Sequence, residues 1–277
     1  MNRIALTKMS GCGNDFILVD NRRLTIAADA APDLAKRICR RRLSVGADGL
    51  ILIEDDPDAD FRWRFFNSDG SPAEMCGNGA RCAARFAFVN GIAGETMHFN
   101  TTAGTIAARI VADGGGGHQV QLRMTAPGPL TTALPVTLRH GGVTVSTVDT
   151  GVPHAVLFVD DVDGVDVVDL GREIRRHACF QPAGTNANFV ARAGEGRLRL
   201  RTYERGVEDE TLACGTGAVA SALAAAQRWH WPSPVSLETR SGGVLKVHFQ
   251  QSADGFDDVL LEGDARFIYT GTLHEEA

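Results

Sequence analysis

A motif built from one cysteine and two glycines occurs twice in this chain. The first copy reads "AEMCGNGARC" (residues 73–82) and the second reads "TLACGTGAVA" (residues 211–220). Their cysteines, Cys76 and Cys214, are 138 residues apart, which is half of the 277-residue chain. A motif repeated at this spacing predicts that the chain consists of two copies of one structural unit.

Other landmarks align at the same offset, and chance does not produce such a series. The aligned pairs are Gly13 with Gly151, Gly46 with Gly184, Phe65 with Tyr203, and Asn67 with Arg205. The sequence therefore predicts an α/β fold of the α+β type, with two pseudo-symmetric halves that arose by internal duplication.

Both halves contain similar patterns of secondary structure. Short apolar runs and alternating polar and apolar residues predict strands, and alanine-rich apolar segments after each cysteine predict helices. The predicted strands are 16–20, 62–67, 97–101, 155–160, 197–204 and 235–239. The predicted helices are 32–42, 79–91 and 217–229, with Gly91 ending the second, and the four glycines 114–117 predict a loop tip.

Many strands around one very apolar helix suggest how each half is built. We expect each half to wrap a mixed or antiparallel sheet around its central helix, with the active site in the cleft between the halves. The predicted N-terminal half-domain covers residues 1–126, with residues 265–277 returning to it. The predicted C-terminal half-domain covers residues 127–264.

Composition excludes several classes of partner. The formal net charge of −6 leaves no basic excess for binding nucleic acid. The first residues lack an apolar segment of signal-peptide length, and no run approaches a membrane span, so we expect a cytoplasmic protein without a membrane partner. The six cysteines form no CxxC pair and no Cys/His cluster with zinc spacing, so we expect reduced thiols and no metal.

Each cysteine-glycine turn could bind an anion and hold a reactive thiol. Its glycines allow a tight turn, and the helix that follows presents unpaired N–H groups and the positive end of its dipole, which bind anions. A cysteine at this position has its pKa lowered below the ordinary value of about 8.5. A single buried cysteine before glycine is usually only a small apolar residue. Two symmetry-related copies favour a functional pair.

Inversion of a stereocentre is the reaction that needs two equivalent groups. One group removes a proton from one face of a carbon, and the other returns a proton to the opposite face. For an amino acid, N–H donors around the α-carboxylate stabilise the charge that builds up there in the transition state. No lysine lies in a setting typical of a Schiff base, so we expect a reaction without an organic cofactor.

The chain resembles the diaminopimelate epimerase family over essentially its whole length. The matching segments, in the family's order, are "KMSGCGNDFILVDN", "FFNSDGSPAEMCGNGARC", "TGVPHAV", "GTNANFV" and "YERGVEDETLACGTGA". The resemblance implies an isomerase that interconverts LL- and meso-diaminopimelate, which are precursors of lysine and peptidoglycan. It also implies no metal, no organic cofactor and a homodimer.

The resemblance also assigns roles to individual residues. It implies that Cys76 and Cys214 are the acid/base pair and that His154 and Glu204 tune the pKa of their thiols. The residues that it implies for substrate binding are Asn14, Asn67, Gly77, Asn78, Asn186, Glu204, Arg205, Gly215 and Thr216. Arg205 offers a bidentate cation for the distal carboxylate, and its repeat partner Asn67 is the neutral, shorter counterpart.

Three positions depart from the family pattern. Val152 stands where many members have asparagine, Cys12 adds a thiol close to Asn14, and the loop between Arg205 and Cys214 is one residue longer. For Cys12 the alternatives are an apolar substitute for leucine and a partner in an off-cycle disulfide.

Three other functions remain open. They are a proline or hydroxyproline racemase of the same fold, a non-catalytic amino-acid-binding protein, and a redox protein that forms a disulfide between Cys76 and Cys214.

Overall fold

The computed structural model describes residues 4–111, 119–139, 141–253, 255–274 and 276–277. The chain divides into two compact units, the first comprising Met1–Leu122 with Gly263–Ala277 and the second Arg123–Glu262. The C-terminal segment thus belongs to the first unit. The glycine tip predicted at 114–117 lies outside the described residues.

Among the described residues, eight strands form the sheet of the first unit. They are β1 (Ala5–Gly11), β2 (Asn14–Asp20), β3 (Gly49–Glu54), β4 (Phe61–Asn67), β5 (Thr96–Thr101), β6 (Gly104–Val111), β7 (Gln119–Arg123) and β17 (Arg266–Thr272). Their order across the sheet is β17-β1-β2-β3-β4-β5-β6-β7. The neighbours β2 and β3, and β4 and β5, are parallel, and the other neighbours are antiparallel.

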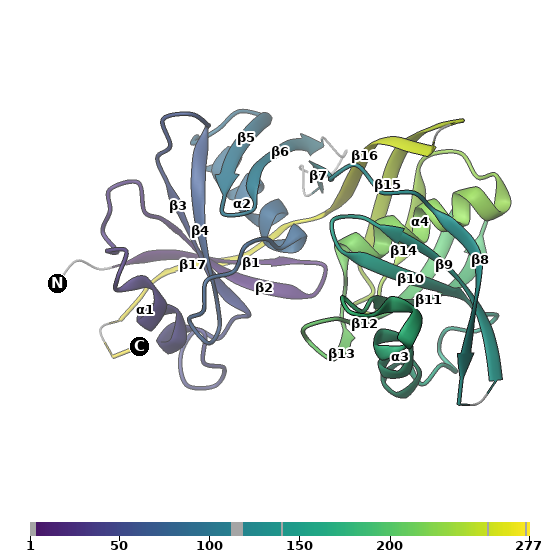
Figure 1. Ribbon diagram of the computed structural model, residues 1–277. Helices are drawn as coiled ribbons and strands as arrows, with labels where there is room; N and C mark the ends of the chain where they lie inside the picture. The colour runs from purple at the N-terminus through teal and green to yellow at the C-terminus, as the bar shows by residue number, and fades with distance from the viewer. Residues whose placement is uncertain (1–3, 112–118, 140, 254, 275) are drawn as a thin grey trace. The chain divides into compact units, whose positions relative to one another are not determined.

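Two helices cover this sheet (Figure 1). Helix α2 (Gly77–Val89) contacts β1, β2, β3 and β6, and ten of its thirteen residues are buried. Helix α1 (Ala31–Ile38) packs Leu34 and Ile38 into a separate apolar cluster with Ile17, Leu50 and Phe66. Because residues alternate between the faces of a strand, the two helices pack against opposite faces of the sheet.

In the described part of the second unit there are nine strands. They are β8 (Thr131–Leu138), β9 (Gly141–Asp149), β10 (Pro153–Phe158), β11 (Asn186–Gly194), β12 (Arg197–Glu204), β13 (Asp209–Thr211), β14 (Val235–Glu238), β15 (Val244–Ser252) and β16 (Gly255–Asp264). Eight of them follow the order β8-β9-β10-β11-β12-β14-β15-β16, and the short β13 pairs with β12.

The helices of the second unit match those of the first. Helix α4 (Gly215–Trp229) contacts β9, β10, β11, β12, β14 and β15, and it is rich in alanine where the sheet encloses it. Helix α3 (Val167–Arg176) packs on the other face through Val167 and Ile174, and a 3₁₀ turn (Ala178–Phe180) follows it. The N-cap of α3 is Asp166, whose side chain accepts a hydrogen bond from the N–H of Asp169.

The two units repeat one topology strand by strand. In both sheets the third and fourth strands in the order are parallel, as are the fifth and sixth, and all other neighbours are antiparallel. The last strand of the chain, β17, takes in the first unit the position that β8 takes in the second. The duplication and the α/β class expected from sequence are therefore confirmed.

The repeat offset is 138 residues at the central helices but 137 in two of the strands. Ile51 lies against Gly79 of α2, and Asn188 lies against Gly217 of α4. Ile51 pairs with Phe65 across the sheet, and Asn188 pairs with Thr202. The structural counterpart of Phe65 is therefore Thr202 rather than Tyr203, and at the same offset Asn67 corresponds to Glu204 rather than to Arg205.

The predicted helix over 32–42 ends early. Helix α1 stops at Ile38, and the N–H groups of Gly46 and Ala47 turn back onto the carbonyls of Ile38 and Cys39. Gly46 has a φ of +74°, which suits this reversal. Arg41, expected on the helix, instead forms ion pairs with Asp15 and Asp48.

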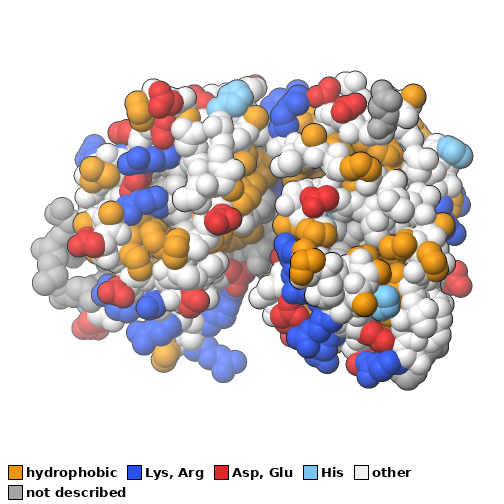
Figure 2. Space-filling model, in the orientation of Figure 1, with side chains coloured by type: hydrophobic (Ala, Val, Ile, Leu, Met, Phe, Trp, Pro, Cys, Tyr) orange, Lys and Arg blue, Asp and Glu red, His pale blue; other side chains and the backbone are white. Residues whose placement is uncertain are grey.

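The surface carries both signs of charge. On the face shown in Figure 2, basic and acidic side chains are interspersed on each unit. None of the described helices has the length and apolar content needed to cross a membrane.

Helix α3 approaches its sheet so closely that one position must be glycine. A Cβ atom on Gly171 would lie 2.4 Å from the Cβ of Tyr203. We expect Gly171→Ala to lower the free energy of unfolding by about 1–3 kcal/mol, because helix and strand must separate. Gly142→Ala is the matched control, since its Cβ would meet nothing within 4 Å. Urea unfolding measures both, and equal effects would contradict this packing.

Candidate active site

The two repeated cysteines occupy the same structural position in their units. Cys76 is the N-cap of α2, with φ −147° and ψ 116°, and Cys214 is the N-cap of α4, with φ −119° and ψ 113°. Cys76 is half-buried and Cys214 is 7 % exposed. Each thiol therefore stands at the positive end of a helix, beside first-turn N–H groups that have no partner within the helix.

The turn at Cys214 is held by hydrogen bonds within the second unit. The N–H of Gly217 donates to the Cys214 Sγ at 3.4 Å, and the Thr216 Oγ1 lies 3.5 Å from the same sulfur. The Thr150 hydroxyl donates to the Thr216 carbonyl at 3.0 Å, which ties the loop before β10 to this turn.

The glycine in the first turn of each central helix faces a different group. A Cβ on Gly79 would lie 3.2 Å from the Ile51 Cδ1, whereas a Cβ on Gly217 would lie 2.3 Å from the Asn188 Oδ1. Glycine is therefore required at 217, where a polar side chain lies directly beneath the helix.

Asn188 also fixes the protonation of His154. Its Nδ2 lies 3.1 Å from the His154 Nδ1 and 3.1 Å from the carbonyl of Ala155, and its Oδ1 accepts from the Thr202 hydroxyl at 3.0 Å. Because an amide nitrogen only donates, the His154 Nδ1 must accept, and the imidazole proton sits on Nε2. Among the described residues, Nε2 has no hydrogen-bond partner.

Burial keeps His154 neutral. Removal from water and, to a smaller extent, the charge of Arg205 lower the pKa of His154 to about 3. At neutral pH this side chain is thus a buried N–H donor without charge.

Three more predicted residues of the second unit lie together at the ends of β10, β11 and β12. The Asn186 Oδ1 accepts from the N–H of Arg205 at 2.8 Å, and its Nδ2 donates to the Pro153 carbonyl at 3.0 Å. The Arg205 side chain is half-buried and donates to the Ala183 carbonyl at 3.1 Å. Beside it, burial raises the pKa of Glu204 above its ordinary value.

The first unit brings Asn14 and Asn78 together. The Asn78 Nδ2 donates to the Asn14 Oδ1 at 2.6 Å, and Asn78 is the second residue of α2. Asn67 is exposed at the end of β4, where its amide donates to the Ser71 hydroxyl at 3.0 Å.

Cys12 and Val152, which depart from the expected sequence pattern, differ in burial. Cys12 is 1 % exposed, with a φ of 48°, and its N–H donates to the Asp264 carboxylate at 2.8 Å. Burial raises the pKa of this thiol to about 11. Val152 is half-buried in the loop before β10.

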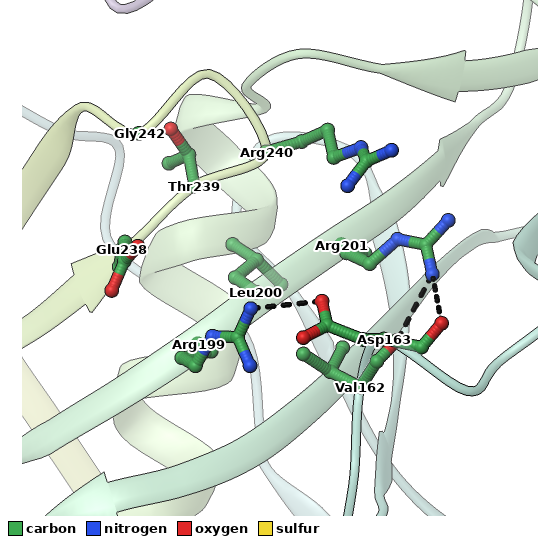
Figure 3. A pocket seen from close by; sticks show the side chains of 9 residues that line it. All are labelled: Val162, Asp163, Arg199, Leu200, Arg201, Glu238, Thr239, Arg240 and Gly242. Carbon is green, nitrogen blue, oxygen red and sulfur yellow. Dashed lines mark hydrogen bonds and ion pairs between the residues drawn. The ribbon is translucent and has the colours of Figure 1, made fainter.

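A pocket of the second unit lies apart from these residues (Figure 3). It contains Arg199, Arg201 and Arg240, and none of the predicted site residues lines it. Arg199 pairs with Asp163 at 2.8 Å, and Arg201 pairs with Glu210 at 2.7 Å and donates to the Val162 carbonyl. Arg240 lies 3.8 Å from the same Glu210 carboxylate, so each of the three guanidinium groups already has an acidic partner, and an anion would compete with these partners. Elsewhere in the described chain, His, Cys, Asp and Glu form no group of three or more that could hold a metal ion.

Comparison with known proteins decides the family. The family model for diaminopimelate epimerase matches residues 6–127 and 146–268, which are one segment in each repeat. The chain belongs to the diaminopimelate epimerase family. The diaminopimelate epimerase of Aquifex aeolicus is 44% identical over 280 residues, covering 97% of both chains. That of Chlorobaculum tepidum is 41% identical and covers 96% of this chain and 99% of its own.

Solved structures share the fold with this member of the diaminopimelate epimerase family. A PhzF-family phenazine biosynthesis protein from Bacillus anthracis matches with a TM-score of 0.75 at 13% identity, over 99% of this chain and 100% of its own. A hydroxyproline epimerase from Agrobacterium vitis matches with a TM-score of 0.69 at 14% identity, over 99% and 93%. At such identities the likeness concerns the fold alone.

Two residues near the cysteine turns were not predicted from sequence. Asn188 contacts His154, and Arg81 lies fully buried in α2. The spacing of Asn186 and Asn188 by two residues in an apolar strand could have placed both on one face. Arg81 stands inside the family motif itself, but its burial depends on contacts that the sequence does not show.

The buried His154 makes stability depend on pH. Its native pKa of about 3 lies below the unfolded value of about 6.5. The resulting stabilisation is present above pH 6.5 and is lost as the pH falls towards 3, because only the unfolded state takes up the proton. Between pH 7 and pH 5 we expect His154 to account for a loss of about 2 kcal/mol. Urea unfolding of the wild type and His154→Gln at both pH values measures this, and equal losses would contradict it.

Proposed function

We propose that this chain interconverts LL- and meso-diaminopimelate, with Cys76 and Cys214 as a thiolate/thiol acid-base pair. The observation that carries this proposal is that both repeats begin their central helix with a cysteine N-cap of the same extended backbone. Family membership supplies the substrate, and the duplicated helix start supplies two equivalent groups. Family membership and the duplicated helix start together support the proposal more strongly than either does alone.

The helix starts support binding of the α-carboxylate. In the proposal, the N–H groups that follow the two cysteines, at Gly77 and Asn78 and at Gly215 and Thr216, donate to the substrate's carboxylate end. These groups begin α2 and α4, and helix N-termini bind anions. As the α-proton leaves, negative charge spreads onto the carboxylate, where fixed donors stabilise it.

The proton balance of the reaction needs both thiols. One cysteine, as thiolate, removes the α-proton from one face of the carbon, and the other, as thiol, delivers its own proton to the opposite face. The substrate leaves with its composition unchanged and one centre inverted. The cysteines end with exchanged protonation states, which suit the reverse reaction.

The remaining predicted residues fit roles around this step. We assign Arg205 and Asn67 to the distal end of the substrate, since a guanidinium binds a carboxylate through two parallel hydrogen bonds. We assign Glu204 and His154 to tuning of the thiols. The neutral Nε2–H of His154 suits a donor rather than a base, because its pKa of about 3 prevents proton uptake at neutral pH.

The fold alone leaves rival reactions open, and one of them is the epimerisation of a proline-type substrate. The Agrobacterium vitis structure that shares this fold is titled a hydroxyproline epimerase with bound trans-4-hydroxy-L-proline. A proline-type substrate has no second carboxylate to engage Arg205, which favours diaminopimelate.

Proton NMR in D2O tests the proposal directly. The purified protein, kept reduced and without added cofactor, is incubated in parallel with LL-diaminopimelate and with trans-4-hydroxy-L-proline. We expect the α-proton signal of LL-diaminopimelate to disappear while the meso isomer forms. Exchange of hydroxyproline alone would establish the rival. If neither compound exchanges, the paired turns bind rather than catalyse, and the proposal is wrong.

We also propose a homodimer that works in the cytoplasm, where thiols stay reduced. Support for a dimer comes from β17, which pairs only with β1 among the described strands and leaves the apolar side chains of Ile268 and Tyr269 exposed. We expect sedimentation velocity to show a dimer and the double variant Ile268→Lys, Tyr269→Lys to shift it to a monomer. The matched control Leu212→Lys, an exposed leucine of the second unit, should leave the dimer intact.

A further inference from the structure

Arg81 is a buried cation that the proposed reaction does not yet use. Its side chain is 0 % exposed in the second turn of α2. The guanidinium donates to the carbonyl of Asp264 at 3.2 Å, the carbonyl of Gly77 at 3.3 Å and the Oδ1 of Asn78 at 2.7 Å. All three acceptors are neutral. Burying a charge without a charged partner costs free energy. We therefore expect Arg81 to have a functional role at this position.

The contact with Asn78 starts a chain of hydrogen bonds. The Asn78 Nδ2 donates to the Asn14 Oδ1 at 2.6 Å, and the Asn14 Nδ2 donates to the Oδ2 of Asp48 at 2.9 Å. The other oxygen of Asp48 accepts from Arg41 at 2.8 Å. A polar relay thus runs from Arg81 through Asn78 and Asn14 to Asp48.

The two ends of this relay fix its direction. A guanidinium only donates, so Asn78 must turn its oxygen towards Arg81 and its nitrogen towards Asn14. A carboxylate only accepts, so Asn14 must turn its nitrogen towards Asp48 and its oxygen towards Asn78. The Arg81 guanidinium and the Asp48 carboxylate therefore require the same orientation of the two asparagine amides. An asparagine amide that could otherwise flip is therefore held in one orientation.

Only the first repeat contains the relay. At the offset of 138, Asn14 corresponds to Val152, Asn78 to Thr216 and Arg81 to Val219. Val219 is fully buried at the position where α2 carries its guanidinium. The relay therefore makes the turn at Cys76 chemically different from the turn at Cys214.

We propose that Arg81 and Asp48 are positioning residues that hold the Asn14 amide in one orientation for substrate binding at the Cys76 turn. This inference rests on the proposed function, in which Asn14 contacts the substrate. Asn14 is half-buried and keeps one amide hydrogen outside the relay, whereas Asn78 is 3 % exposed. Asn14 is thus accessible to a ligand. The buried Asn78 connects Asn14 to Arg81 and so keeps the Asn14 amide in its orientation.

Steady-state kinetics with LL-diaminopimelate tests the inference at the Arg81 end. We expect Arg81→Met to raise KM about tenfold, as for the loss of one substrate hydrogen bond, with kcat within about threefold of the wild type. Arg81→Lys still offers a donor to Asn78 and should bring KM back to within about threefold of the wild type.

Arg85→Met is the matched control for the Arg81 variants. Arg85 is also buried in α2, where it donates to the carbonyl of Ala265 and lies 5.2 Å from the centroid of the Phe267 ring. We expect this variant to lose stability but to keep the wild-type KM. An Arg81→Met enzyme with the KM of Arg85→Met would overturn the inference, and so would Arg81→Lys behaving like Arg81→Met.

Asp48 allows the same test at the more exposed end of the relay. Its side chain is 38% exposed. We expect Asp48→Ala to raise KM as Arg81→Met does, and the control Asp20→Ala, which removes a surface ion pair with Arg22, to leave KM unchanged. Equal KM values for the two aspartate variants would contradict the relay.

A measurement without substrate separates this inference from the proposed function. The side-chain amide signal of Asn14 can be assigned in a ¹H–¹⁵N spectrum as the one missing from Asn14→Asp. We expect this signal to shift in Arg81→Met and Asp48→Ala and to stay in place in Arg85→Met and Asp20→Ala. An unmoved signal in all four variants would overturn the relay even in an active enzyme. A shifted signal in an enzyme inactive on diaminopimelate would uphold the relay and reject the proposed function.

Discussion

Each half of this protein depends on a helix that begins inside its own sheet. Helices α2 and α4 are each buried at ten residues, so their first turns cannot move without moving the strands around them. The cysteine at each N-cap is therefore positioned by the core and not by a mobile loop. The close approach of α4 to its sheet also explains why residue 217 is glycine, because a Cβ atom there would collide with the Asn188 side chain.

The duplication gives two equal backbones, and buried polar groups make them unequal. Beneath α4, the Asn188 amide and the neutral His154 form a hydrogen-bonded pair. In the first unit the groups at the corresponding positions, Ile51 and Phe16, are apolar, and the polar element is instead Arg81 within the helix. The two cysteine turns thus share one backbone conformation and differ in the polar groups packed behind them.

Much of the fold could be predicted from the sequence because the repeat is long and its local patterns are strong. The strand over 197–204 and the helices after both cysteines form as expected, since periodicity and alanine content decide them locally. The helix over 32–42 was predicted too long, because the ion pairs of Arg41 and the turn at Gly46 depend on contacts outside the segment. The slip to an offset of 137 in the strands was also missed, since only the pairing of Asn188 with Thr202 shows it.

The candidate site was predictable in outline for a similar reason. Motif spacing identifies Cys76 and Cys214, which the structure places at equivalent helix starts. The sequence did not identify Asn188, Arg81 and Asp48 as part of the site. Their roles depend on tertiary contacts, which a sequence pattern does not show. Asn188 contacts Thr202 and His154, which are 14 and 34 residues away, and Asp48 contacts Asn14, which is 34 residues away. Arg81 contacts Asn78 in its own helix, but its burial also depends on the carbonyl of Asp264, 183 residues away.

If two thiols share one inversion, removal of either thiol must stop the reaction. Cys76→Ala and Cys214→Ala are compared with Cys39→Ala, which removes a buried thiol of the core. We expect each of the first two variants to stay folded and to lose conversion of LL- to meso-diaminopimelate by about 10²-fold or more, as for loss of an acid/base group. Cys39→Ala should retain activity. Near-wild-type conversion by either Cys76→Ala or Cys214→Ala would contradict the account.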